Sequence, residues 1–265
     1  MNNLHRELAP ISDEAWAQIE EEAARTFKRH LAGRRVVDVR GPAGPELAAV
    51  STGHLSTLAP PAEGVRAWRR EAAGLVELRR PFELSRQAID DVERGSGDSD
   101  WQPVKDAAKG LAMAEDRAVF DGYAAAGITG LIAASSNQPI ALPGSVDGYP
   151  EAIAQGLSAL RMAGVDGPYS VLLSAEAYTG VAETSDHGYP VLEHLRRLVT
   201  GEIIWAPALT GALIVSTRGG DFDLHLGQDV SIGYDSHTSN TVTLYLQESF
   251  TFLPYTAEAV VHLRP

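Results

Sequence analysis

The sequence contains no cysteine. This absence excludes disulfide bonds, thiolate metal ligands and cysteine nucleophiles. No apolar run approaches the roughly 20 residues that a membrane-crossing helix needs, so we expect no membrane span. The first residues, Met1 to Glu7, lack the apolar core of a signal peptide, and a cytoplasmic protein is therefore expected.

Positive charge is also scarce, because 22 Lys and Arg residues face 35 Asp and Glu residues and leave a net charge of −13. The densest basic cluster, Lys28-Arg29-His30 with Arg34-Arg35, falls where a helix should end, and there it complements the helix dipole. The sequence therefore gives no reason to expect a nucleic-acid partner.

Short catalytic signatures are missing as well. The chain has no phosphate-binding loop, no dinucleotide-binding glycine motif, no G-x-S-x-G elbow and no H-E-x-x-H motif. Asp90, Asp91 and Glu93 form an acidic group that fits a solvated helix end or a salt bridge between subunits better than an acid–base pair. We therefore expect no enzyme activity, no metal site and no cofactor.

The elements that are present predict a mixed α and β chain. A helix is expected from Ser12 to Leu31, since apolar residues recur at helical spacing behind a serine N-cap. A longer helix is expected from Trp101 to Ala126, where Glu115 falls on the apolar stripe and needs a partner or an edge position. The C-terminal part is rich in strand patterns, above all from Thr241 to Leu253.

Between these elements, residues 41–74 are rich in glycine and proline and contain only two weak strand patterns, at Leu47–Ser51 and His54–Leu58. Such a stretch cannot build a core of its own and is unusually long for a loop inside a compact domain. We predict that it forms a β-hairpin arm. An isolated two-stranded hairpin is only marginally stable in water. The arm therefore predicts that the chain associates with other chains.

Short segments spread over the whole chain resemble the encapsulins, bacterial nanocompartment shell proteins, and most of all their actinobacterial and mycobacterial members. These segments are Leu8-Ala9-Pro10, Ala23 to Lys28, Gly33 to Val39, Asp90 to Gly95, Gly167-Pro168-Tyr169, His187 to Pro190, Arg218 to Phe222, Leu226 to Asp229 and Ser231 to Tyr234. The resemblance implies an α+β fold like that of a tailed-phage major capsid protein. It implies a peripheral domain (residues 1–42, 75–130 and 218–265), an extended loop (43–74) and an axial domain (131–217).

The resemblance also implies a function. Encapsulins self-assemble into closed icosahedral shells, the smallest of about sixty identical chains. They enclose cargo enzymes, commonly dye-decolourising peroxidases or ferritin-like proteins, that carry a C-terminal targeting peptide and serve in oxidative stress or iron handling. The peptide would dock in a groove formed by Phe27, Leu31, Arg34, Asp38, Val39, Ile232 and Tyr234. Phe27 is equally well explained as core packing.

A second implied site is a pore at the five-fold axes, lined by Ser185, Asp186, His187 and Tyr189. An ordinary exposed loop is the simpler explanation of the same residues. Some encapsulins bind a flavin beside a tryptophan, but the matching helix here carries Gln87 and Ala88, so no flavin is expected. Two other classes stay open at this point: a phage or prophage capsid protein that packages DNA, and an enzyme with an unrecognised site of the hydrolase kind.

Overall fold

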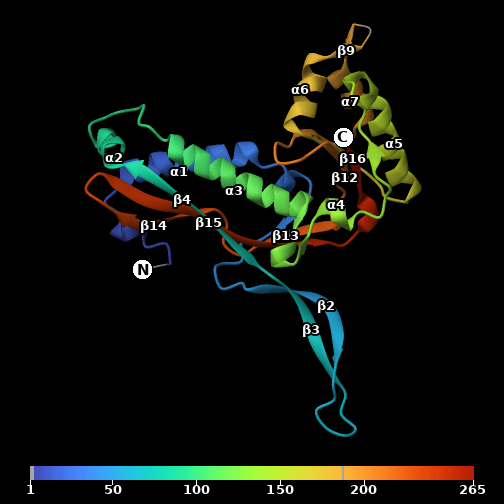
Figure 1. The fold of residues 1–265 in the computed structure, drawn as a ribbon, viewed down its shortest axis with the longest axis horizontal. Helices are drawn as coiled ribbons and strands as arrows, with labels where there is room; N and C mark the ends of the chain where they lie inside the picture. Colours follow the sequence, from blue (N-terminus) through green and yellow to red (C-terminus); the bar gives the residue numbers. More distant parts are fainter. Residues whose placement is uncertain (1–2, 187) are drawn as a thin grey trace.

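The computed structural model describes residues 3–186 and 188–265. Figure 1 shows two lobes and a thin arm that extends away from both. The arm consists of β2 (Ala49–Leu58) and β3 (Ala67–Gly74), which pair antiparallel with each other. The two strand pieces predicted at Leu47–Ser51 and His54–Leu58 form a single strand, β2. Its register with β3 shifts between Ser51 and Leu55.

The first lobe is a five-stranded sheet covered by helices. The strand order is β1-β13-β15-β14, and β4 pairs with the long β15 along its other edge. The strands are β1 (Asp38–Arg40), β4 (Val76–Ser85), β13 (Phe222–Leu226), β14 (Ser231–His237) and β15 (Thr241–Pro254). The helices are α1 (Asp13–His30), α2 (Arg86–Glu93) and α3 (Gln102–Phe120). Strand β3 continues almost directly into β4, so the arm is a direct extension of this sheet.

Helix α1 begins where the sequence predicts, because the Ser12 side chain accepts a hydrogen bond from the Ala15 N–H at 3.3 Å. Its apolar stripe, with Trp16, Ile19 and Phe27, is buried in one cluster with α3 and the first sheet. Helix α3 ends at Phe120 rather than Ala126. Gly122 follows with φ 94°, a left-handed conformation that stops a helix, and residues 124–126 form a separate 3-10 turn.

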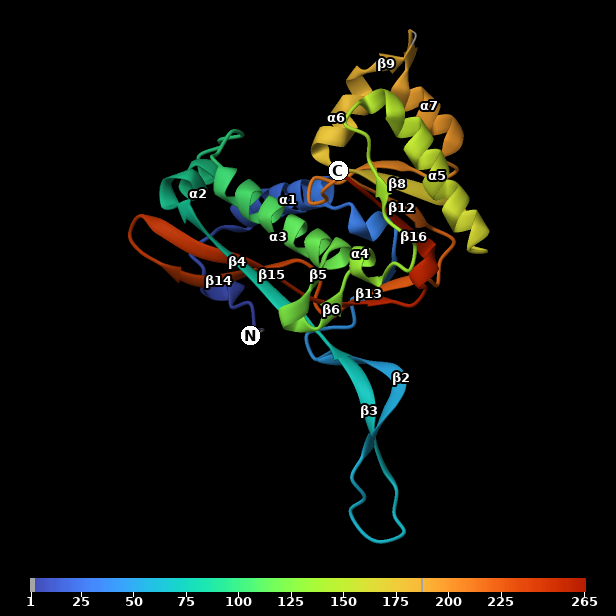
Figure 2. The same ribbon diagram turned by 45° about the vertical axis from the view of Figure 1, so that its right-hand side comes forward.

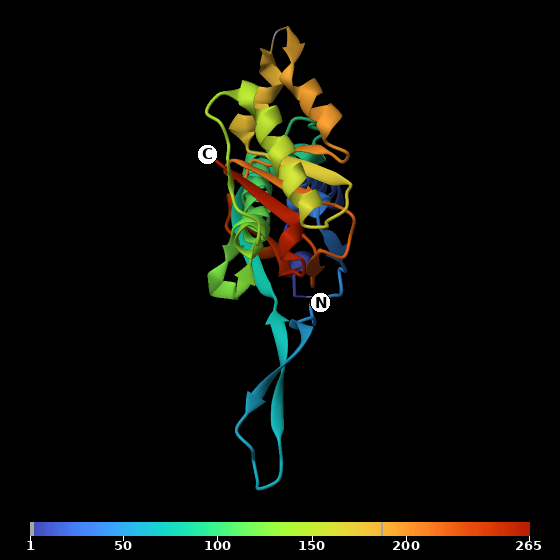
Figure 3. The same ribbon diagram turned by 90° about the vertical axis from the view of Figure 1, so that its right-hand side faces the viewer.

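The second lobe is built on another five-stranded sheet in the order β11-β8-β12-β16-β7. Its strands are β7 (Ile140–Ala141), β8 (Tyr169–Leu173), β11 (Ile203–Trp205), β12 (Ala212–Ser216) and β16 (Val260–Arg264), and its helices are α5 (Tyr149–Met162), α6 (Ala175–Glu183) and α7 (Val191–Leu198). The four-residue helix α4 (Leu131–Ala134) and the small pair β5 (Gly122–Tyr123) and β6 (Ile128–Thr129) lie at the junction. Figure 3 shows this lobe and the arm at opposite ends of the molecule.

The two lobes are tied together by the end of the chain. Strand β16 hydrogen-bonds to β12 of the second sheet, although the resemblance assigns residues 218–265 to the peripheral domain. Strand β16 therefore follows β15 of the first sheet in the chain but pairs within the second sheet. The boundaries of the three predicted domains remain a prediction. Within the described residues, no helix has the length and apolar character needed to cross a membrane.

Candidate functional site

The groove predicted from the resemblance is organised around the turn that follows α1. The side chain of Asp116, on α3, accepts hydrogen bonds from the backbone N–H groups of Ala32 and Gly33, both at 2.8 Å. A Cβ on residue 33 would lie 2.9 Å from the Asp116 carboxylate, so glycine is needed for this approach. The turn is thereby fixed to α3 and directs Arg34 toward the sheet.

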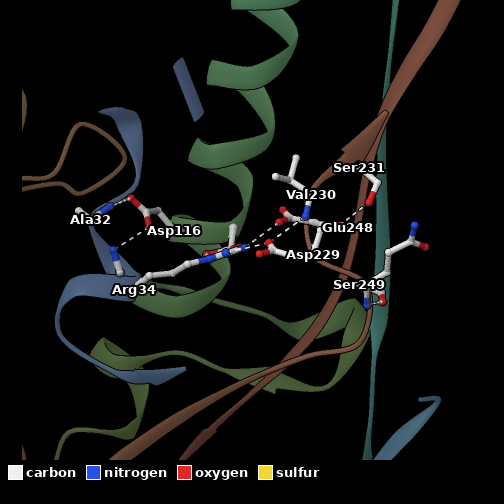
Figure 4. Close-up of polar contacts among 11 residues, drawn as sticks. Ala32, Arg34, Asp116, Asp229, Val230, Ser231, Glu248 and Ser249 are labelled. Atoms are coloured by element: carbon white, nitrogen blue, oxygen red, sulfur yellow. Dashed lines mark hydrogen bonds and ion pairs between the residues drawn. The ribbon is translucent and has the colours of Figure 1, made fainter. Parts of the chain in front are cut away.

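The guanidinium of Arg34 lies among three carboxylates from different parts of the chain (Figure 4). Its Nε is 2.9 Å and its Nη2 2.5 Å from the two carboxylate oxygens of Glu115 on α3. Its Nη1 donates to Asp229 at 2.8 Å, and its Nη2 lies 3.3 Å from Glu248 on β15. We call Arg34, Glu115, Asp229 and Glu248 the Arg34 cluster. It joins the turn after α1, helix α3, strand β15 and the segment before β14.

Burial makes this cluster electrostatically unusual, since Glu115 and Glu248 are both fully buried. Burial opposes the charge of Arg34, but hydrogen bonds and the charges of Glu115 and Asp229 outweigh it and raise the pKa of Arg34. Burial, reinforced by the neighbouring charge of Glu115, raises the pKa of Glu248 well above its usual value. Burial also raises the pKa of Asp116 to about 7, against the backbone hydrogen bonds that favour its charged form.

The apolar members of the predicted groove lie together. Phe27, Leu31 and Ile232 belong to one buried cluster, and the half-buried Tyr234 packs against it. The guanidinium of Arg34 lies 5.3 Å from the Phe27 ring centroid, within cation–π range. Phe27 is thus part of the core as well as a neighbour of the Arg34 cluster.

Beside this cluster is a hollow of about 280 Å³ between α1 and the strands β14 and β15. Its apolar lining comes from Leu4, Ala23, Val230, Ile232 and Leu246. Val230 directly follows Asp229, so the hollow begins next to the Arg34 cluster. This is the part of the predicted groove with room for an additional side chain.

Asp38 and Val39 lie on β1, on the other side of Arg34 in the chain. The Asp38 carboxylate accepts a hydrogen bond from the Gly220 N–H at 2.5 Å, and Val39 is 40% exposed. A second hollow of about 240 Å³ is lined by Arg35, Asp38 and residues of the 216–222 turn. The seven predicted groove residues therefore do not form one continuous surface. One group lies in or against the buried cluster beside α1 (Phe27, Leu31, Ile232 and Tyr234), and the other lies on β1 (Asp38 and Val39). Arg34 lies between the two groups, with its guanidinium bound inside the protein.

Three of the four predicted pore residues, Ser185, Asp186 and Tyr189, lie at the tip of the second lobe (Figure 1). Ser185 and Asp186 form β9, which pairs with β10 (Tyr189–Pro190) between α6 and α7. The Tyr189 ring stacks on His194 with 4.7 Å between centroids, and the Arg197 guanidinium lies 4.9 Å from the Tyr189 ring. His187 lies outside the described residues, and so the ring of four residues stays a prediction.

Other candidate chemistry is explained by local structure. Asp91, in the acidic group at the end of α2, forms an exposed ion pair with Arg94. Across the residues that the structure describes, no three His, Asp or Glu side chains are grouped so that they could hold a metal ion.

Sequence reasoning missed three members of this site: Asp116, Asp229 and Glu248. A signal for Glu248 was available, because it shares the buried face of β15 with Leu244, Leu246 and Phe250. An acidic residue at an inward position of a strand requires a cationic partner. The same argument was applied to Glu115, for which the structure confirms the expected partner.

The fold defines the class of protein first. The model superposes on a virus-like particle from Pyrococcus furiosus with a TM-score of 0.65, covering 94% of this chain and 98% of that chain at 18% identity. It also superposes on the capsid of an empty GTA particle with a TM-score of 0.54, covering 87% and 88% at 15% identity. At these identities the likeness shows the fold alone, which is that of capsid subunits.

Sequence similarity then identifies the family. The family model described as "Encapsulating protein for peroxidase" matches residues 1–251. Type 1 encapsulin shell proteins of Rhodococcus erythropolis and Mycobacterium tuberculosis are each 65% identical over 263 residues, 99% of this chain and at least 99% of those proteins. The type 1 encapsulin shell protein of Rhodospirillum rubrum is 47% identical and covers 100% of this chain. The chain belongs to the encapsulin family of shell proteins.

Proposed function

We propose that this chain assembles into a closed icosahedral nanocompartment of about sixty copies that encloses a cargo enzyme. The cargo would carry a C-terminal targeting peptide and would be a dye-decolourising peroxidase or a ferritin-like protein. The compartment would lie in the cytoplasm and serve in oxidative stress or iron handling, and the shell itself would have no catalytic activity. Family membership and the description of the matching family model support this proposal.

The observation on this chain that carries the assembly proposal is the arm. Strands β2 and β3 pair only with each other along their length and extend away from both lobes. The arm exposes large apolar side chains, with Leu55 at 61% and Trp68 at 52%, together with Leu58 and Val65. Exposed apolar side chains on a two-stranded ribbon need a partner surface, and a second copy of the chain provides one.

The groove beside the Arg34 cluster is the proposed docking site for the targeting peptide. Ile232 lines an apolar hollow there, and Phe27 and Leu31 support it from α1. The guanidinium of Arg34 forms ion pairs with Glu115, Asp229 and Glu248. Its proposed role is therefore to fix the turn after α1 against the segment before β14. Asp38 and Val39 would extend the docking surface along β1, and Tyr234 would close it at the β14 end.

The proposed pore would lie where symmetry copies of the β9–β10 tip meet, and the residues that the resemblance assigns to it are Ser185, Asp186, His187 and Tyr189. Repeated acidic groups would favour cations. Repeated histidines would respond to pH near neutrality.

Deletion of Glu46–Gly64 tests the assembly proposal. The variant removes most of the arm but leaves both lobes intact, and we expect soluble subunits or small oligomers in place of shells. Size-exclusion chromatography and negative-stain microscopy measure the outcome. A matched variant with only Leu55→Ser and Trp68→Ser should weaken assembly in the same direction, because it removes apolar contact and keeps the ribbon. Intact shells from the deletion variant would show that the arm is not the assembling element.

A further inference from the structure

The first described residues of the chain lie across the groove beside α1. The backbone carbonyl of Leu4 accepts a hydrogen bond from the Tyr234 N–H at 2.8 Å, on the edge strand β14. The carbonyl of Asn3 accepts one from the Tyr245 hydroxyl at 3.2 Å. Figure 1 places this N-terminal segment beside β14. We call residues 3–8 the strap.

The strap covers an apolar surface with one side chain. Leu4 is only 8% exposed and lines the 280 Å³ hollow together with Ala23, Ile232 and Leu246. Another hollow, of about 510 Å³ and separate from the one beside Asp38, continues along α1 toward Ile11 and Trp16. The ion pair between Arg6 and Glu20, at 2.6 Å, lies between the two hollows, since both residues line each of them. The two hollows and the strap together form one groove along α1.

The strap is held more weakly than the elements beneath it. The 3-10 turn Arg6–Leu8 contains no buried residue, and Leu8 is 55% exposed. The Arg6–Glu20 pair is partly solvated, and pairs of this kind contribute little to stability. His5 has φ 51°, the single positive φ of a non-glycine residue in the described chain, which is a strained conformation. Segments with few buried contacts and local strain open at low free energy.

We propose that the strap is a displaceable occupant of a peptide-binding groove, and that an incoming cargo peptide takes its place. The bound strap defines what the groove accepts. The ligand is an extended peptide with an aliphatic side chain in the position of Leu4, a backbone carbonyl for the Tyr234 N–H, and a basic group within reach of Glu20. This is strand addition to the outer edge of β14, the edge that does not pair with β15. The inference rests on the proposed function, which assigns Ile232 and Tyr234 to the cargo peptide.

Competition follows from this arrangement. A groove filled by its own chain binds an added peptide with an affinity reduced by the fraction of time that the groove is open. The tethered strap competes at an effective concentration on the order of millimolar. The strap therefore raises the affinity that a peptide needs for loading. The apolar lining of the hollow excludes peptides that carry a charged residue in place of Leu4.

The strap sequence itself is the probe for a test that does not require the natural cargo. A fluorescent protein carrying residues 3–11 as a C-terminal tag is co-expressed with the shell chain, and the fluorescence that co-purifies with shells is measured. In Leu4→Asp shells the strap cannot seat, because an unpaired carboxylate would enter the apolar hollow. We expect at least tenfold more reporter in Leu4→Asp shells than in unmodified shells. A reporter tag with the same Leu4→Asp change should not load into either shell.

Leu8→Asp shells are the matched control, since they place the same charge on an exposed residue of the same segment and should load reporter at the unmodified level. If Leu4→Asp prevents particle formation, Arg6→Gln loosens the strap without changing the apolar lining, and about threefold more loading is expected. Equal loading of the two tags, or equal loading in all intact shells, would overturn the strap proposal. Absence of particles from the unmodified chain would instead overturn the proposed function.

Discussion

Replacing Arg34 by methionine tests how the α1 turn, α3 and the first sheet are held together. The substitution keeps an aliphatic side chain against Phe27 and removes the guanidinium that lies 2.5 Å from Glu115 and 3.3 Å from Glu248. Two fully buried carboxylates then lose their cationic partner. Breaking a buried pair in this way costs about 3–5 kcal/mol, a large part of the roughly 5–15 kcal/mol that stabilises a typical domain.

In a chain of this size each kcal/mol lowers the melting temperature by about 2–4 °C, so the expected loss for Arg34→Met is about 6–20 °C. The loss should be smaller at pH 5 than at pH 8, because burial raises the pKa of Glu248 and this carboxyl group can take up a proton when its cationic partner is missing. Thermal unfolding of purified shells at both pH values, followed by fluorescence, measures this difference.

Arg35→Met is the matched control. Arg35 is the next residue, and its ion pair with Glu202 is exposed, at 50% and 61% of the two side chains. An exposed pair of this kind is worth about 0–1 kcal/mol. If the melting temperatures of Arg34→Met and Arg35→Met shells lie within about 2 °C of each other, which corresponds to about 1 kcal/mol or less, the Arg34 cluster does not hold the fold together.

Two further predictions concern neighbouring residues. Burial raises the pKa of Glu248 and brings the pKa of Asp116 to about 7. The folded chain therefore keeps protons on these carboxyl groups that the unfolded chain releases from about pH 4 upward. Because the unfolded chain binds fewer protons, the free energy of unfolding should fall as the pH rises to 7 and above. The melting temperature of Glu248→Gln should therefore equal that of the unmodified protein near pH 5 and exceed it at pH 8. A lower melting temperature than that of the unmodified protein at pH 8 would contradict the raised pKa of Glu248. Gly233→Ala would place a Cβ 2.1 Å from the Tyr245 ring and should cost about 1–3 kcal/mol. Gly233→Ala should cost much less in a Tyr245→Ala background, where the clashing ring is absent, and an equal cost in both backgrounds would mean that the clash lies elsewhere.

The helices and most strands follow from local signals. Apolar residues at helical spacing and the Ser12 N-cap predict α1, and the alternation from Thr241 onward predicts β15. The end of α3 is wrong by six residues, because alanine propensity favours helix through residue 126 while Gly122 turns the backbone. That stop depends on one glycine in a left-handed conformation, which a propensity argument underweights.

The site shows why long-range pairing is harder to predict. The need of Glu115 for a partner is visible in the sequence, yet its partner Arg34 is 81 residues away in the chain. Asp229 and Glu248 reach the same guanidinium only because β14 and β15 pair with each other beside α3. The strap is likewise invisible to periodicity, since one buried leucine and two backbone carbonyls form no pattern.

Electron microscopy of the protein purified alone shows directly whether this chain builds a closed container. Mass spectrometry of what co-purifies from the native host accompanies it. We expect uniform hollow particles that carry a peroxidase or ferritin-like protein and no packaged DNA. A monomer or small oligomer would contradict the assembly claim, and particles filled with DNA would contradict the cargo claim.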